Sequence, residues 1–143
     1  MNATMRKFGY PDTLLKEYRH WVVLLRPQQV TAGCLVLASK SDAESLGELG
    51  ADAFAEMAEA TRDLQAALKR AFDYSKINYL ALMMVDPQVH FHVIPRYDGP
   101  REAAGATFDD PGWPKPPDLS RVVPLTDAQF RNLLDKLKSA WPS

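Results

Sequence analysis

The chain has 143 residues, of which 46% are apolar and 24% are charged. This length fits one domain with a sizeable core, and the apolar content excludes disorder through most of the chain. The net charge is -1, so the sequence lacks the basic excess typical of proteins that bind nucleic acid or anionic membrane surfaces.

The single cysteine, Cys34, excludes an intrachain disulfide and a zinc cluster built from cysteines alone. Residues 1–11 carry positive charge but lack the apolar stretch of a secretion signal. The longest apolar run covers residues 79–85, whereas a membrane-spanning helix needs roughly 20 residues. We therefore expect a cytoplasmic protein that does not contact a membrane.

The first 40 residues predict two strands after a polar beginning. Residues 1–20 are mixed in character and suggest only a short helical turn or an irregular lead-in. Residues 21–25 are apolar and include two β-branched side chains, and residues 34–38 form a second apolar run after Gly33, so each predicts a strand. The segment between them is short enough to join antiparallel neighbours.

Two helices are predicted after these strands. Ser41 and Glu44 fit a capping box, which predicts the start of a short helix. A long helix is expected over about residues 52–74, because apolar side chains recur there at intervals of three or four. The side chains of this stripe are Phe54, Met57, Thr61, Leu64, Leu68 and Phe72. We expect the stripe to face the core.

Two apolar strands are predicted next, over residues 77–85 and 89–94, with Pro87 interrupting the chain between them. Pro95 is expected to end the second strand. Residues 98–124 have little periodicity and predict an irregular arm at the surface. The order of two strands, a helix and two strands predicts an α+β fold with an antiparallel sheet.

A last helix is expected after this arm. Thr126 and Gln129 fit a capping box at its start. Its apolar face would contain Phe130, Leu133, Leu134, Leu137 and Trp141.

Two of the three histidines stand close together in the second of the later strands, at His90 and His92. Side chains alternate between the two faces of a strand, so Gln88, His90, His92 and Ile94 share one face. The two imidazoles then lie ~6.5–7 Å apart along the strand. Val89, Phe91 and Val93 alternate with them and are expected to point to the other face, into the core.

Three interpretations of His90 and His92 are open at this point. They could be half-buried structural histidines. They could also be metal ligands, but a metal site needs at least a third ligand, and the only other histidine, His20, is far away in the sequence. They could also act in catalysis, since a neutral imidazole nitrogen can attack phosphorus and hold a covalent phosphoramidate. A second imidazole and an amide could then hold phosphate oxygens. The row of polar side chains on one face favours catalysis.

This stretch resembles the signature of the histidine triad (HIT) superfamily, in which three histidines alternate with apolar residues. Six of the seven signature positions match in the sequence Gln88-Val89-His90-Phe91-His92-Val93-Ile94, and Gln88 replaces the first histidine. The order of predicted elements over about residues 15–98 is also similar. The resemblance implies a single HIT-like domain over residues 1–143, with about five antiparallel strands and a long central helix. Residues 99–143 would form an additional arm and helix.

The resemblance further implies an enzyme that cleaves the α-phosphate linkage of a dinucleoside polyphosphate or a nucleoside phosphoramidate. His90 would form a nucleotidyl-histidine, while His92 and Gln88 would contact the phosphate oxygens. The residues expected to bind nucleotide or phosphate are Arg26, Cys34, Asn78 and Arg96. The implied enzyme is a homodimer that acts on a nucleotide substrate, needs no cofactor or metal, and binds no nucleic acid.

Two other functions are alternatives to a nucleotidyl hydrolase or transferase. The first is a nucleotide-binding HIT scaffold with weak or no turnover, because Gln88 and Cys34 stand where many members have histidine. The second is a metal-dependent hydrolase with a different fold, which a chelator would inhibit.

Overall fold

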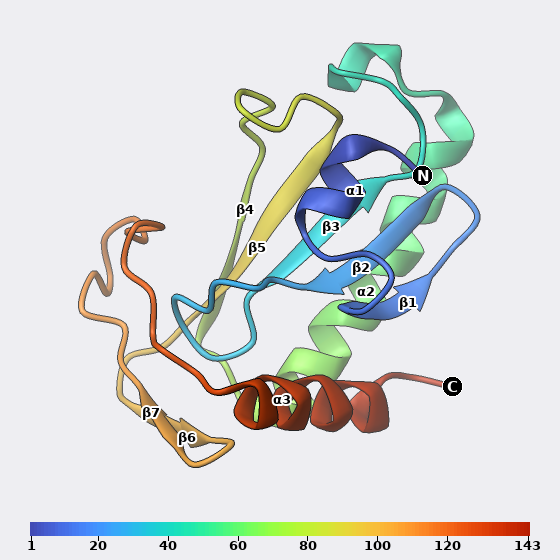
Figure 1. Ribbon diagram of the computed structural model, residues 1–143. Helices are drawn as coiled ribbons and strands as arrows, with labels where there is room; N and C mark the ends of the chain where they lie inside the picture. Colours follow the sequence, from blue (N-terminus) through green and yellow to red (C-terminus); the bar gives the residue numbers. More distant parts are fainter.

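The computed structural model describes residues 1–143 and contains a five-stranded antiparallel sheet with the strand order β1-β2-β3-β5-β4 (Figure 1). The strands are β1 (Leu14–Glu17), β2 (Trp21–Leu25), β3 (Leu35–Ser39), β4 (Lys76–Leu80) and β5 (His90–Arg96). The long helix α2 (Ala51–Phe72) covers one face, and the short helix α1 (Ala3–Lys7) lies on the other. The expected α+β fold is confirmed.

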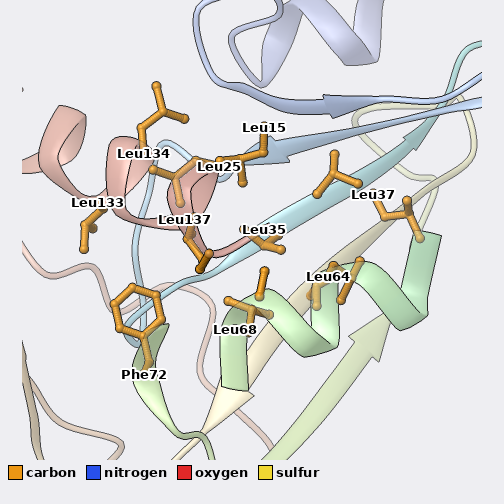
Figure 2. Packing of buried hydrophobic residues seen from close by; sticks show 14 of the residues in the cluster. Leu15, Leu25, Leu35, Leu37, Leu64, Leu68, Phe72, Leu133, Leu134 and Leu137 are labelled. Carbon is orange, nitrogen blue, oxygen red and sulfur yellow. The ribbon is translucent and has the colours of Figure 1, made fainter. Parts of the chain in front are cut away.

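Strands β2 and β3 are buried along their whole length because apolar side chains cover both faces of the sheet. On the α2 face, leucines of these strands pack against α2 and the C-terminal helix (Figure 2). On the α1 face, Met5 and Phe8 pack on Val22, Leu24 and Val36. The alternation of side chains along each strand assigns one set to each face.

The C-terminal helix α3 (Asp127–Ala140) begins at the predicted capping box, in which Thr126 and Gln129 each bind the other's backbone N–H. Its buried residues are Leu133, Leu134, Leu137 and Ala140. They pack against α2 and against β1 at the edge of the sheet (Figure 2). The predicted position of this helix is confirmed, and Phe130 and Trp141 of the predicted apolar face are partly buried against the same core.

The N-terminal residues are more ordered than expected. Asn2 caps α1 by accepting the N–H of Met5, and β1 pairs with β2 at the edge of the sheet. The polar character of residues 1–20 concealed both elements, because α1 has only five residues and one turn shows no periodicity.

The predicted helix at Ser41 and Glu44 is wrong. The Ser41 hydroxyl instead bonds with that of Ser39 and accepts the N–H of Ala43. The only helical turn in this region is the 3-10 turn η1 (Leu46–Glu48).

Helix α2 is confirmed, but its buried face is displaced at the first turn. Ala53 is buried there, whereas the Phe54 side chain is 39% exposed. Further along, Leu64, Leu68 and Phe72 are buried as predicted. No helix of the structure is both long and apolar enough to cross a membrane.

The two later strands have different bounds from those predicted. Strand β4 ends at Leu80, and residues 81–85 form a loop. Strand β5 continues past Pro95 to Arg96. Its pairing with β3 ends at Val93, so the missing N–H of Pro95 leaves no gap in that ladder.

The arm over residues 98–124 is not irregular throughout. It contains a hairpin of β6 (Arg101–Ala103) and β7 (Ala106–Phe108), and Phe108 is buried in the main core. Residues 114–117 of the arm lie beside β4 and Arg96 of β5. Further along, the Val123 N–H bonds to the backbone oxygen of Gln29 in the turn between β2 and β3.

Candidate active site

His90 and His92 lie on the α1 face of β5, as the alternation predicted. Their ring centroids are 5.0 Å apart in an edge-to-face arrangement. Both residues are almost completely buried, with exposed fractions of 2% and 7%. Val89 and Val93 point to the opposite face, into the core beneath α2.

The His90 ring is held through its Nδ1 atom, which lies 2.8 Å from the backbone oxygen of Gln88. A carbonyl oxygen only accepts hydrogen bonds, so Nδ1 carries the proton. In the neutral ring, Nε2 is then unprotonated and has a free electron pair. This is the form that a nucleophilic imidazole requires.

The His92 ring is held in the opposite tautomer. Nε of Arg26 donates a hydrogen bond to His92 Nδ1 over 3.2 Å. Since Nδ1 accepts, the proton of the neutral His92 ring resides on Nε2. Burial and then the positive charge of Arg26 lower the pKa of His92 to about 4. His92 is therefore a neutral hydrogen-bond donor near pH 7.

Arg26 is a buried cation without a carboxylate partner. Its second bond goes from Nη1 to the backbone oxygen of Gln28 over 2.6 Å. None of the four ion pairs in the structure includes Arg26, although its exposed fraction is only 8%. Burial lowers the pKa of this guanidinium because it disfavours the charged form.

The side chains of His90, His92 and Arg26 line a cavity of about 370 Å³. Its other walls come from α1, from the loop after β4 and from the C-terminal arm. Lys7 and Asp86 form an ion pair of 3.4 Å at its edge. The remaining lining residues are Phe8, Gln28, Leu82, Met83, Met84, Val85 and Leu119.

Gln88 lies outside β5 and does not line this cavity, although the alternation predicted that it would share a face with the two histidines. Its Oε1 accepts hydrogen bonds from the backbone N–H and the hydroxyl of Thr4, over 3.2 and 2.6 Å. The expected position of Gln88 beside the phosphate is therefore replaced by a contact with α1.

Asn78 and Arg96 lie together, but away from the cavity. Arg96 forms a buried ion pair with Asp110, with 2.7 Å between Nε and Oδ2, and donates a second bond to Asn78 Oδ1. It also donates to the backbone oxygen of Lys115. These contacts fix the C-terminal arm to the sheet, so the structure does not bring Asn78 and Arg96 to the site expected from the sequence.

Cys34 is also absent from the cavity. It is completely buried, packs with Val30 and Ile94, and exchanges hydrogen bonds with Thr31. Gln29 was not singled out from the sequence, yet it is completely buried beside Arg26. Its amide spans the β2–β3 turn, donating to the backbone oxygens of Arg26 and Cys34.

No group of three or more His, Cys, Asp or Glu side chains is arranged to hold a metal ion. The two imidazoles instead face a cavity together with a guanidinium. This arrangement offers an electron pair, a neutral donor and a positive charge, which suits an anion that reacts with a nucleophile.

Comparisons with known proteins agree with the signature. A family model described as HIT domain matches residues 9–99. A histidine triad protein from Sinorhizobium meliloti 1021 has 22% identity and a TM-score of 0.75, with coverage of 98% of this chain and 95% of that one. One from Marinobacter aquaeolei VT8 has 27% identity and a TM-score of 0.71, with coverage of 90% and 87%. The comparison with curated proteins finds no similar sequence.

Proposed function

The chain belongs to the HIT domain family, and from this premise we propose that it is a nucleotidyl hydrolase or transferase. Its substrate would be a nucleoside phosphate with a leaving group on the α-phosphorus, as in a dinucleoside polyphosphate or a nucleoside phosphoramidate. The reaction would pass through a covalent nucleotidyl-histidine on His90 and require no metal.

The observation that carries this proposal is the charge of Arg26. A buried guanidinium without a carboxylate is unfavourable unless an anion compensates it. Arg26 lines the cavity that also contains His90 and His92. A phosphate group in this cavity would neutralise the guanidinium and bring phosphorus to the imidazoles.

The first step would be attack by Nε2 of His90 on the α-phosphorus. A nitrogen–phosphorus bond forms, and the bond from phosphorus to the leaving group breaks with its electron pair. The His90 ring becomes cationic during the attack, and the backbone oxygen of Gln88 stabilises its Nδ1–H. In the second step, water or another acceptor attacks phosphorus and loses its proton to solvent. The nitrogen–phosphorus bond breaks with its electron pair returning to Nε2, which regenerates neutral His90.

His92 and Arg26 would act on the charge that develops on the phosphoryl oxygens. His92 has its proton on Nε2 and is neutral, so it can donate a hydrogen bond to a phosphoryl oxygen. The proton that the leaving group takes up would come from water. Arg26 supplies a positive charge whose side chain is itself buried, and such a charge acts more strongly than one in bulk water.

The test is intact-protein mass spectrometry after rapid mixing with diadenosine and diguanosine polyphosphates and with the corresponding nucleoside phosphoramidates. We expect wild-type protein to gain the mass of one nucleotidyl group. His90→Ala should gain none, whereas His20→Ala, a matched change at the remaining histidine, should gain the same mass as wild type. The mass of the adduct would identify the nucleoside.

The alternative is a nucleotide-binding scaffold of the same family with weak or no turnover. It predicts that nucleotides bind with no adduct and no product from any substrate in the panel. Loss of turnover on addition of a chelator would instead contradict the metal-free scheme.

We also propose that the protein is a homodimer, as the resemblance implies. The side chain of Phe54 is 39% exposed on α2, and β4 is an edge strand, so both offer surface to a second copy. Light scattering coupled to size-exclusion chromatography would give twice the chain mass for a dimer and the single mass of 16.0 kDa for a monomer.

A further inference from the structure

The N-terminal helix contributes directly to the surroundings of the two imidazoles. The Phe8 ring lies against both, with centroid distances of 5.5 Å to His90 and 5.5 Å to His92. Phe8 follows α1 immediately and is almost completely buried. The position of α1 therefore sets one wall of the space in which His90 and His92 can move.

Gln88, two residues before β5, holds this helix. Thr4 donates both its backbone N–H and its hydroxyl to Oε1 of Gln88, and the Thr4 hydroxyl accepts the backbone N–H of Gln88 over 3.3 Å. A backbone N–H can only donate, so the Gln88 atom that faces Thr4 must be the amide oxygen. The Thr4 N–H is one of the first donors of α1 and has no partner within the helix.

One turn of helix connects Thr4 to Phe8, whose ring contacts both imidazoles. The backbone oxygen of Thr4 accepts the N–H of Phe8 over 3.2 Å. A displacement of Thr4 would therefore displace Phe8, and the ring of Phe8 packs on both histidines. The path leads from Gln88 through Thr4 and Phe8 to His90 and His92.

We propose that Gln88 is a positioning residue, which docks α1 through Thr4 and thereby sets Phe8 against the His90 and His92 rings. It does not touch the substrate. The glutamine at the first triad position and the N-terminal segment are thus one functional unit. This inference rests on the proposed function for its kinetic consequences, but its structural part concerns the free protein.

The remaining anchors of the segment make the proposal testable. Asn2 donates to the backbone oxygens of Ser39 and Ser41, so α1 remains attached to the sheet when the Thr4–Gln88 contact is lost. Thr4→Val removes the hydroxyl and Gln88→Met removes the acceptor, with little change of shape in either case. Thr4→Ser retains the hydroxyl.

The kinetic experiment is a double-mutant cycle on the rate of nucleotidyl-histidine formation at saturating substrate. We expect Thr4→Val and Gln88→Met each to slow this step about tenfold, because the reacting group is misplaced, while KM changes less than about twofold. The double variant should be no slower than the slower single variant, and Thr4→Ser should react like wild type. Thr126→Val, which alters the cap of α3 far from the cavity, is the matched control and should not slow the step.

Two kinetic outcomes would overturn the proposal. If Gln88→Met is slow and Thr4→Val reacts normally, Gln88 acts on the substrate itself. If the effects of the two changes multiply in the double variant, the residues act separately.

The second experiment needs no turnover. NMR spectra of the substrate-free protein report the ring signals of His90 and His92, which Thr4→Val and Gln88→Met should shift in the same direction. Unchanged ring signals in either variant would overturn the inference. If wild-type protein forms no adduct, the proposed function fails, but these ring signals still decide the role of Gln88.

Discussion

Nε of Arg26 donates a hydrogen bond to Nδ1 of His92 over 3.2 Å. The bond joins two strands that are not neighbours, since β3 lies between β2 and β5 and Arg26 directly follows β2. It holds the His92 proton on Nε2 and prevents protonation at Nδ1. Arg26 therefore acts on His92 even before any ligand enters the cavity.

The first prediction concerns pH. The pKa of His92 is about 4 in the folded protein, compared with an ordinary value of 6.5. Between these two values the unfolded chain binds a proton at residue 92 that the folded chain does not bind. The free energy of unfolding should therefore fall as the pH is lowered from about 6.5 to about 4, and this contribution should be constant above that window.

Urea unfolding at pH 7, 6, 5 and 4 measures this dependence. His92→Gln should show a smaller decrease than wild type over the same range. His20→Gln changes a histidine outside this buried cluster and should retain the wild-type decrease. An equal decrease in wild type and His92→Gln would contradict the prediction.

The second prediction separates the charge of Arg26 from its bond to His92. Arg26→Met should lower kcat/KM at least about 100-fold, because it removes both. Arg26→Lys retains the charge but not the Nε–H, so its kcat/KM should lie between those of Arg26→Met and wild type.

The stability of the same variants provides a check. Arg26→Met removes a buried charge that has no carboxylate partner, so the free energy of unfolding should decrease by less than about 1 kcal/mol or increase. A large loss of stability, with kcat/KM unchanged, would show that Arg26 has a structural role only.

The third prediction concerns Gln29, whose side chain makes four hydrogen bonds within the β2–β3 turn. It donates to the oxygens of Arg26 and Cys34, and it accepts the N–H groups of Gly33 and Cys34. Gln29→Leu would leave the Arg26 oxygen and the N–H groups of Gly33 and Cys34 unpaired, whereas the Cys34 oxygen would still accept the N–H of Arg26. The free energy of unfolding should therefore fall by about 3 kcal/mol or more. Gln28→Leu is the control, since its exposed side chain makes no such bonds and should cost less than about 0.5 kcal/mol.

The fourth prediction tests the structural role of Arg96. Asp110→Ala leaves the buried Arg96 guanidinium without its partner, and should lower the free energy of unfolding by about 3–5 kcal/mol. Lys69→Ala breaks an exposed ion pair with Asp73 and should cost less than about 1 kcal/mol. Nucleotide affinity, measured by calorimetry on the folded fraction, should be unchanged in Asp110→Ala. Weaker nucleotide binding in Asp110→Ala would indicate that Arg96 does contact the phosphate.

Much of the fold could be predicted because its signals are local. The strand of residues 21–25 is marked by a short apolar run, and the helix after Thr126 by its capping box. The shared face of His90 and His92 also follows from local geometry, since alternation along a strand needs no knowledge of the partners.

The errors have physical causes that are not local. Residues 81–85 are as apolar as a strand, but Met84 and Val85 are 78% and 88% exposed in a loop that lines the cavity. Arg96 could not be assigned to the ion pair because Asp110 belongs to an arm without periodicity. Gln88 and Thr4 lie 84 positions apart, so no pattern along the chain connects them.

The cavity is assembled from two kinds of chain segment, and this has a consequence for how its specificity could change. The imidazoles stand on β5, where His92 is paired with Val36 on one side and Leu80 on the other. The opposite wall comes from residues 82–86 and from Leu119, which belong to no strand or helix. Substitutions there can alter the fit of a leaving group without disturbing the ladder that carries the nucleophile. Directed evolution for new substrates would begin with residues 82–85 and keep the sheet constant.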